Sequence, residues 1–302
     1  MKVLVTGGAG FIGSHSVDAL LTAGAEVVVL DNFSNGKRSN LSTHGKLQVI
    51  EGDIRDSETV RMAMREATHV LHLAAQVSVQ ASVTDPANSC DNNIVGFLRV
   101  LDAARAQGLK RVVYASSAAV YGIPQELPLT ENSPTKPISP YGLEKLINDQ
   151  YAALYAQLYG LIPLGMRYFN VYGPRQDPAS PYAGVISKWV AALNDEVAVR
   201  IFGDGLQTRD FIYVHDIARA NVLALQSTDT GVCNVGTGTS VTLLQMLDAL
   251  EQAAGRSSQK QFGPTAAGDI RDSQMRPTRL QAIFGPQKNT PLVEGLKALM
   301  RA

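Results

Sequence analysis

The stretch "VLVTGGAGFIGSH" (residues 3–15) decides the fold class of this chain. A short apolar run leads directly into glycines at positions 7, 8, 10 and 13, and a helix-like segment follows. Glycine permits a sharp turn and lets the backbone approach a pyrophosphate, which then meets the amide groups at the start of the helix. Because the glycines lie between a strand and a helix, the pattern predicts a dinucleotide-binding loop.

Apolar runs alternate with helix-like segments throughout the first half of the chain. The apolar runs are residues 2–5, 26–30, 47–50, 69–75, 111–117 and 162–170. Residues 91–108 and 141–159 have the spacing of apolar side chains that is typical of helices. Strands separated by helices form a parallel sheet that is covered on both faces. We therefore predict an α/β fold, a Rossmann-type doubly wound parallel sheet with a smaller α/β C-terminal substrate domain.

The pattern changes near residue 170, where a segment rich in proline and glycine predicts a long irregular loop. Shorter strand-like and helix-like segments follow. We predict an NAD-binding domain over residues 1–169 and a domain mainly for the substrate over residues 170–302. Part of residues 207–236 is expected to return to the first domain.

Composition excludes several classes of protein. The 27 lysines and arginines balance the 27 aspartates and glutamates, so charge gives no reason to expect a nucleic-acid partner. Cys90 and Cys233 fit no metal spacing, and we expect both to be buried free thiols in a reducing compartment. The five histidines have no ligand spacing, so no metal is expected. Without a signal peptide or a membrane-length apolar run, the chain is expected to be cytoplasmic, with no membrane partner.

Two carboxylates at the ends of predicted strands bear on the choice of cofactor. Asp31 ends the second apolar run, where a carboxylate accepts hydrogen bonds from ribose hydroxyls and repels a 2′-phosphate. This position favours NAD over NADP, although Lys37 and Arg38 follow nearby. Asp53 ends the third run and is placed to meet the adenine edge, with a turn residue at a strand end as the alternative.

Tyr141 and Lys145 are the candidate catalytic pair. They lie at positions i and i+4 of one helix and so share a face, just after Pro140 in the first turn. Ser117 ends a strand, and ligands bind at the carboxyl ends of the strands in such sheets. A nearby ammonium and a positive nicotinamide would lower the pKa of the tyrosine phenol from its ordinary value near 10 and make it a base.

Several long motifs, in one order, resemble the extended short-chain dehydrogenase/reductase family, in its nucleotide-sugar epimerase/dehydratase branch, and most of all its UDP-glucose and UDP-N-acetylglucosamine 4-epimerases. The motifs are "TGGAGFIG", "DNFSNG", "GDIRD", "HLAAQ", "SSAAVYG", "SPYGLEK", "RYFNVYGPRQ", "GDGLQTRDFIYVHD" and a second "GDIRDS". The resemblance covers nearly the whole chain, and it implies a catalytic triad of Ser117, Tyr141 and Lys145 with NAD as cofactor.

The resemblance also implies two sets of contacts. The cofactor contacts are Gly7, Gly10, Phe11, Ile12, Gly13, Asp31, Asn32, Asp53, Ile54, Leu73, Ala74, Ala75, Gln76, Tyr141, Lys145 and Tyr168. The substrate contacts are Ser78, Ser117, Asn170, Val185, Arg209, Asp269, Arg271 and Ser273. Asn170 and Arg209 would contact the diphosphate of a UDP-sugar, and Val185 would line the nucleobase pocket. The family's arginine near the C-terminal "GD" is replaced by Ala266, and Arg271 would compensate for it.

The branch contains enzymes with different outcomes after a shared first step, the oxidation of the sugar at C4. Dehydratases carry an acid and a base directly after the catalytic serine or threonine, whereas this chain has Ala118 and Ala119. Alanine transfers no proton, so epimerisation at C4 is favoured. In the epimerases that the chain resembles, the residue at the position of Ser273 limits the size of the sugar pocket, and a serine there would leave room for an N-acetyl group. The resemblance therefore implies UDP-GlcNAc and UDP-GalNAc, with UDP-Glc and UDP-Gal as further candidates. A dehydratase, a decarboxylase, a reductase and a non-catalytic NAD-binding protein remain as alternatives.

The resemblance implies a homodimer as well. The helices at residues 91–107 and 141–159 carry extra apolar residues such as Leu146, Leu154 and Leu158. In the family, the equivalent helices of two subunits form a four-helix bundle. The alternative is that these residues only cover the sheet.

Overall fold

A computed structural model describes residues 1–176, 184–265 and 270–301 of the chain. Its largest element is a parallel seven-stranded sheet with the strand order β11-β6-β5-β4-β1-β2-β3. The strands are β1 (Lys2–Thr6), β2 (Glu26–Asp31), β3 (Leu47–Glu51), β4 (His69–His72), β5 (Arg111–Ser117), β6 (Ile162–Tyr168) and β11 (Gly231–Val235). The predicted α/β fold class is confirmed.

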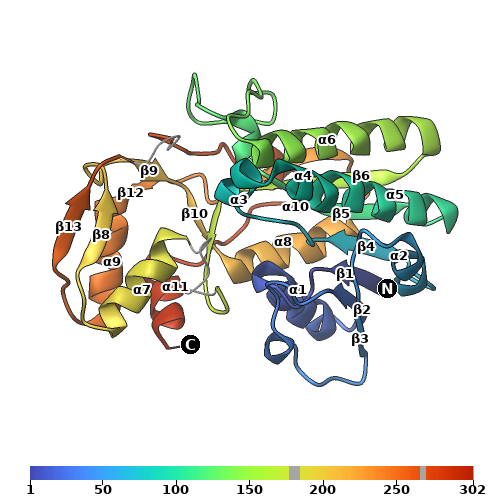
Figure 1. Ribbon diagram of the computed structural model, residues 1–302, viewed down its shortest axis with the longest axis horizontal. Coiled ribbons are helices and arrows are strands. Elements are labelled where there is room, and N and C mark those ends of the chain that lie inside the picture. Colours follow the sequence, from blue (N-terminus) through green and yellow to red (C-terminus); the bar gives the residue numbers. More distant parts are fainter. Residues whose placement is uncertain (177–183, 266–269, 302) are drawn as a thin grey trace.

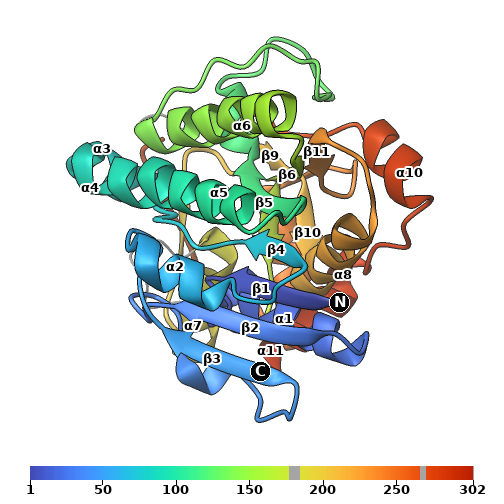
Figure 2. The same cartoon turned by 90° about the vertical axis from the view of Figure 1, so that its right-hand side faces the viewer.

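Helices cover both faces of this sheet, which explains why the strand sequences are apolar almost throughout (Figure 2). On one face lie α1 (Phe11–Thr22), α8 (Val214–Gln226) and α10 (Thr278–Phe284), which share a core with β1, β2 and β6. On the other face lie α2 (Ser57–Ala63), α5 (Gly96–Ala106) and α6 (Pro140–Tyr159). The short helices α3 (Val79–Thr84) and α4 (Pro86–Cys90) lead through a π-helical turn (Asp91–Val95) into α5.

A smaller lobe lies beside the carboxyl ends of the strands (Figure 1). It contains α7 (Val185–Asn194), α9 (Leu243–Ala254), α11 (Leu292–Met300) and a parallel pair of strands, β8 (Val199–Phe202) and β13 (Lys260–Gly263). Trp189, Met246 and Leu296 belong to its separate hydrophobic core. Thr242 and Gln245 form a capping box at the start of α9, so the chain itself specifies where this helix begins.

Short paired strands connect the two lobes. β7 (Asn170–Tyr172) pairs in parallel with β10 (Phe211–Tyr213), and β9 (Thr208–Arg209) pairs in antiparallel fashion with β12 (Val241–Thr242). After β10 the chain returns to the sheet through α8 and β11, and β11 adds to the edge beside β6. The domain bounds at residues 169 and 170 stay a prediction.

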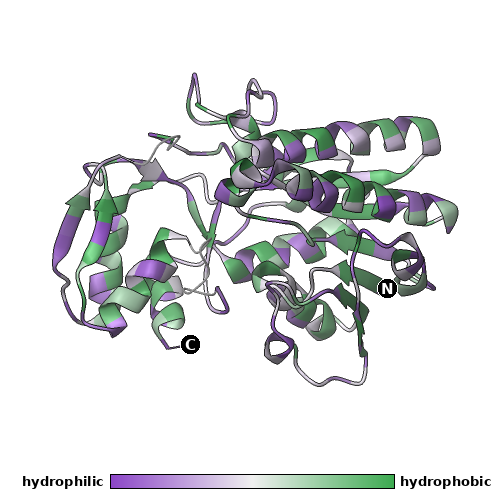
Figure 3. Ribbon diagram, viewed as in Figure 1, coloured by the Kyte–Doolittle hydropathy of each residue, from purple (hydrophilic) through white to green (hydrophobic). Residues whose placement is uncertain are grey.

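Some side chains lie differently from what their sequence suggests. Cys233 is a buried free thiol as expected, but Cys90 is only partly buried, because it ends a short helix near the surface. Leu146 packs against the core, whereas Leu154 and Leu158 are exposed. Figure 3 shows polar and apolar residues mixed along α5 and α6. Within the described ranges, no helix is both long and apolar enough to span a membrane.

Candidate active site

The loop between β1 and α1 is tightly packed, and only glycine fits two of its positions. Gly7 has a φ of +71°, and a Cβ added there would lie 2.6 Å from the amide nitrogen of Ala74. A Cβ added at Gly13 would overlap the carbonyl oxygen of Gly7 and approach the Cα of Gly8 to 2.8 Å. The loop therefore presents bare backbone and the start of α1, which is the arrangement that a pyrophosphate requires.

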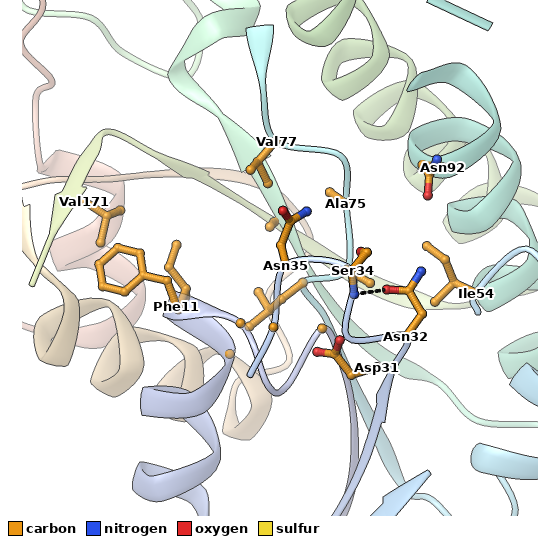
Figure 4. Close-up of a pocket in the computed structure, with 18 of the residues that line it drawn as sticks. Phe11, Asp31, Asn32, Ser34, Asn35, Ile54, Ala75, Val77, Asn92 and Val171 are labelled. Carbon is orange, nitrogen blue, oxygen red and sulfur yellow. Dashed lines mark hydrogen bonds between the residues drawn. The ribbon is translucent and has the colours of Figure 1, made fainter. Parts of the chain in front are cut away.

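A cavity of about 770 Å³ opens from this loop along the carboxyl ends of the strands (Figure 4). Most of the residues predicted to contact the cofactor line it. They are Gly7, Gly10, Phe11, Ile12, Gly13, Asp31, Asn32, Ile54, Leu73, Ala74, Ala75, Tyr141, Lys145 and Tyr168. A volume of this size lies in the range of pockets that hold small organic ligands and cofactors.

The carboxylate of Asp31 organises one end of the cavity. It accepts hydrogen bonds from the amides of Ala9 and Phe33, each at 2.8 Å, and so joins the glycine loop to the turn after β2. Asn32 continues this turn, since its side-chain oxygen accepts the amide of Ser34 at 3.1 Å (Figure 4). Each carboxylate oxygen can accept a second hydrogen bond, so Asp31 can also bind ribose hydroxyls.

Asp53 and Gln76 do not line this cavity. The carboxylate of Asp53 forms an ion pair with Arg55 at 2.8 Å and accepts a hydrogen bond from Asn32 at 3.1 Å. The hydrogen bond from Arg55 lowers the pKa of Asp53 to about 2. The Gln76 side chain donates to the carbonyl of Ser78 at 3.0 Å and to the hydroxyl of Ser89 at 3.2 Å. Both side chains thus have structural partners, and their cofactor contacts stay a prediction.

Ser117, Tyr141 and Lys145 come together at the same cavity. Ser117 is the last residue of β5, and the other two lie on the first turns of α6, where the Ser139 side chain caps the helix. The Nζ atom of Lys145 lies 5.7 Å from the Tyr141 ring centroid and donates to the carbonyl of Ala115 at 3.0 Å. Three residues distant in sequence therefore face one space.

Burial shifts the pKa values of this cluster. Burial raises the pKa of Tyr141, and the hydrogen bond with Ser117 opposes that rise only in part. Burial lowers the pKa of Lys145 to about 8, against the opposite pull of the Asp149 and Glu144 carboxylates. The lysine therefore does not by itself make the phenol acidic, because both groups are desolvated together.

Of the predicted substrate residues that the structure describes, only Ser117 lines that cavity. The others lie at the start of α3, in α7 and in the segments between the lobes. Ser78 is buried and caps α3 by accepting the amide of Ala81 at 2.9 Å. Val185 begins α7. Asp269 and the substituted position Ala266 lie outside the described residues.

The remaining substrate residues converge around β9. The amide side chain of Asn170 donates to the carbonyl of Asp210 at 3.3 Å. Arg209 donates to the carbonyl of Arg271 at 3.2 Å, and the backbone amide of Ser273 donates to the carbonyl of Thr208 at 3.1 Å. The Arg271 side chain forms an ion pair with Asp204, at 2.8 Å, on the exposed side of this region. Its role in replacing the family's arginine stays a prediction.

Sequence reasoning missed several residues that line the cavity. They are Leu30, Phe33, Ser34, Asn35, Gly36, Lys37, Asn40, Gly52, Val77, Asn92, Ala115, Ser116, Phe169, Val171, Arg175 and Gln176. Phe33, Ser34, Asn35 and Gly36 belong to the "DNFSNG" motif. This motif was a signal for them, because asparagine, serine and glycine are typical of a turn directly after a strand.

The fold and the site define a class: an enzyme of the Rossmann type with a dinucleotide loop and a tyrosine–lysine–serine cluster at the ends of the strands. In the described part of the chain, no group of three or more metal-ligating side chains comes together. The chain matches the model of the NAD dependent epimerase/dehydratase family over residues 3–236, and it belongs to this family.

Similar proteins cover the chain almost end to end. A UDP-glucose 4-epimerase of Mycolicibacterium smegmatis is 39% identical in an alignment of 302 positions, which covers 98% of this chain and 96% of that protein. Among solved structures, a UDP-N-acetylglucosamine 4-epimerase from Methanobrevibacter ruminantium in complex with UDP-N-acetylmuramic acid has a TM-score of 0.96 at 37% identity, covering 99% of this chain and 97% of that one. The UDP-glucose 4-epimerase of Thermus thermophilus in complex with NAD has a TM-score of 0.92 at 41% identity, covering 100% and 98%.

Proposed function

We propose that this protein is an NAD-dependent UDP-sugar 4-epimerase that interconverts UDP-GlcNAc and UDP-GalNAc. The observation that carries the proposal is the cluster of Ser117, Tyr141 and Lys145 on one cavity, with Ala118 and Ala119 directly after the serine. The relatives named as 4-epimerases support the reaction at C4.

The cavity fits NAD by the chemistry of its donors. The bare backbone around Gly7 and Gly13 leaves no space for side chains, so it suits a pyrophosphate. Asp31 would hold the adenosine ribose, and Lys145 the nicotinamide ribose. When bound, NAD supplies the acceptor for a hydride from the sugar C4 atom and later the donor that returns it.

The residues of the chain would handle the proton. Tyr141 as phenolate takes the proton of the sugar 4-hydroxyl, and the hydroxyl of Ser117 donates a hydrogen bond to the same oxygen. The Lys145 ammonium, together with the positive charge of a bound nicotinamide, would stabilise the phenolate that this role requires. After the 4-keto sugar has turned over in the pocket, Tyr141 returns the proton to the oxygen on C4. Ala118 and Ala119 offer no acid or base, so elimination at C5 and C6 lacks its catalyst.

The substrate rests on fewer observations than the reaction. Ser273 is a small residue beside β9, near the predicted diphosphate contact Arg209. A larger side chain there would reduce the space for a 2-acetamido group. Among the similar solved structures, one is a UDP-N-acetylglucosamine 4-epimerase and another a UDP-glucose 4-epimerase, so UDP-Glc and UDP-Gal are the second candidate pair.

The test uses purified protein without added NAD. It is incubated with UDP-GlcNAc or with UDP-Glc, and proton NMR of the anomeric region follows the C4 epimer. Conversion of UDP-GlcNAc into its C4 epimer would support the proposal and would indicate that NAD is tightly held. Turnover of the unacetylated pair alone would refute the substrate choice, and a 4-keto-6-deoxy product would refute the reaction.

We also propose a homodimer in which α5 and α6 of two subunits form a four-helix bundle. The apolar side chains of Leu154 and Leu158 on α6 are 47% and 63% exposed in the single chain. Exposed apolar side chains on one helix support a face that a second subunit covers. Sedimentation of the wild-type chain and of Leu158→Lys tests this, since the charge should disperse a dimer formed through that face. The cytoplasmic location stays a prediction.

A further inference from the structure

Asp210 connects the segments that carry the predicted substrate contacts. It lies between β9 and β10 and is fully buried. Its Oδ1 atom accepts hydrogen bonds from the amide of Thr237 at 2.8 Å and from the hydroxyl of the same residue at 2.7 Å. Its Oδ2 atom accepts the amides of Gly238 at 2.9 Å and Met275 at 3.4 Å. One carboxylate therefore joins its own segment to two others that are distant in sequence, residues 237–238 and Met275.

The backbone of Asp210 adds a fourth segment. Its carbonyl oxygen accepts hydrogen bonds from the main-chain amide of Asn170 at 3.1 Å and from the side-chain amide of the same residue at 3.3 Å. Of the two predicted diphosphate contacts, Asn170 is thus hydrogen-bonded to Asp210, and Arg209 directly precedes Asp210 in the sequence. The position of each depends on where Asp210 lies.

The Met275 contact extends this framework to the predicted substrate residue Ser273. Residues 271–276 run beside β9, where Thr208 bridges to Asp272 and its hydroxyl donates to the Asp272 carboxylate at 2.7 Å. The amide of Ser273 then donates to the carbonyl of Thr208 at 3.1 Å. The segment is therefore fixed to β9 directly and to the Asp210 carboxylate two residues later.

The surrounding chain is shaped for this carboxylate. A Cβ added at Gly236 would lie 3.0 Å from Oδ2 of Asp210 and 2.8 Å from the Met275 side chain. Gly238 has a φ of +79°, which turns its amide toward the carboxylate in a conformation that other residues rarely adopt. Two glycines thus permit the approach of residues 236–238 to Asp210.

We propose that Asp210 is a positioning residue that assembles the UDP-sugar site, by holding the residues around Asn170, Arg209 and Ser273 in one fixed arrangement. This inference rests on the proposed function. It assigns to Asp210 no contact with the sugar nucleotide and no part in the proton transfer, so its loss should weaken substrate binding far more than it slows chemistry.

The test compares Asp210→Asn with a matched control. The amide keeps the shape of the carboxylate but turns an NH₂ group toward backbone donors, which repels residues 237–238 or 275. Asp216→Asn is the control, because Asp216 is also buried and likewise accepts the amide of a threonine, Thr290, at 2.8 Å and its hydroxyl at 3.2 Å. Its threonine lies outside the predicted substrate segments.

For Asp210→Asn, we expect the KM for UDP-sugar and the Kd for UDP to rise at least about tenfold, because hydrogen bonds to a buried charge are lost. The value of kcat and the NAD content should remain close to wild type. Hydrogen exchange should accelerate in peptides covering residues 235–240 and 271–276. Thr237→Val, which removes one donor, should produce a smaller change in the same direction. Asp216→Asn should leave KM unchanged.

Two outcomes would overturn the inference. One is that the KM and the Kd for UDP of Asp210→Asn lie within about twofold of those of the control, Asp216→Asn. The other is that hydrogen exchange in Asp210→Asn stays at the wild-type rate in both peptides, even if the variant is less stable overall. If the wild-type protein neither binds UDP nor epimerises a UDP-sugar, the proposed function fails, whereas the exchange measurement still decides whether Asp210 holds these segments.

Discussion

Replacing Tyr141 by phenylalanine removes one hydroxyl and tests the proposed chemistry directly. No other group at this position can take over the proton. Lys145 Nζ is engaged by the carbonyl of Ala115 at 3.0 Å, and Ala118 and Ala119 have no proton to exchange. A positioned base contributes about 10²- to 10⁴-fold to rate, so we expect turnover to fall by about three orders of magnitude, or roughly 4 kcal/mol in the barrier.

The same substitution should leave the fold and the cofactor in place. Tyr141 lies on the cavity wall and is only partly buried, and phenylalanine keeps its ring, so the loss of the hydroxyl should cost little stability. Tyr155→Phe is the matched control on α6, because its hydroxyl bonds Asp102 at 2.7 Å and does not line the cavity. The assay is NMR of the epimerisation, with NAD measured after acid release. A Tyr141→Phe protein that kept more than about a tenth of the wild-type rate would refute the assignment of the base.

Three further predictions concern the cofactor loop, pH and the core. Gly13→Ala should reduce the NAD that copurifies at least about tenfold, because the new Cβ overlaps the loop, whereas Gly45→Ala, which meets nothing within 4 Å, should retain it. His15 is buried, and burial lowers its pKa from 6.5 to about 4. The unfolded chain thus binds a proton first as pH falls, and up to about 3 kcal/mol of stability present above pH 6.5 should be lost by pH 4. Between pH 6.5 and 4, the free energy of unfolding measured in urea should depend less on pH in His15→Gln than in the wild type. An equal dependence in both proteins would contradict this. Arg167→Met strips the buried Asp149 of its ion pair at 3.0 Å and should cost about 3–5 kcal/mol, measured as a shift in the urea midpoint; a loss below about 1 kcal/mol would show that the pair contributes little.

The sequence predicted best those features that depend on local chemistry. Gly7 and Gly13 are required by close backbone packing that any strand–loop–helix of this kind creates, so the spacing of the glycines was sufficient to predict the loop. The loop at residues 33–40 was not assigned to the cofactor, because its place is set by distant partners. The amide of Lys37 and the side chain of Asn40 both donate to the carbonyl of Ala9, at 3.1 and 2.9 Å.

Other features were ambiguous because a local partner competed with a distant one. Asp53 suited both an adenine contact and a turn, and the structure gives it Arg55, two residues away. The pKa of Tyr141 could not be judged from its neighbour Lys145, since the depth of burial of both groups decides the direction. Asp210 gave no signal in the sequence, because its partners at residues 237, 238 and 275 are brought together only by the fold.

The return of β11 to the edge of the large sheet has a consequence for biosynthesis. β11 pairs with β6, yet it is made more than 60 residues later, after α7 and β8. Until residue 235 has left the ribosome, β6 is an unprotected edge strand, and such edges promote aggregation. A nascent chain stopped near residue 170 should therefore need a chaperone, even though its dinucleotide loop is already complete. Only α7 and β8 of the smaller lobe are made before the sheet is closed, and α9, β13 and α11 follow β11. The two lobes should therefore mature together rather than one after the other.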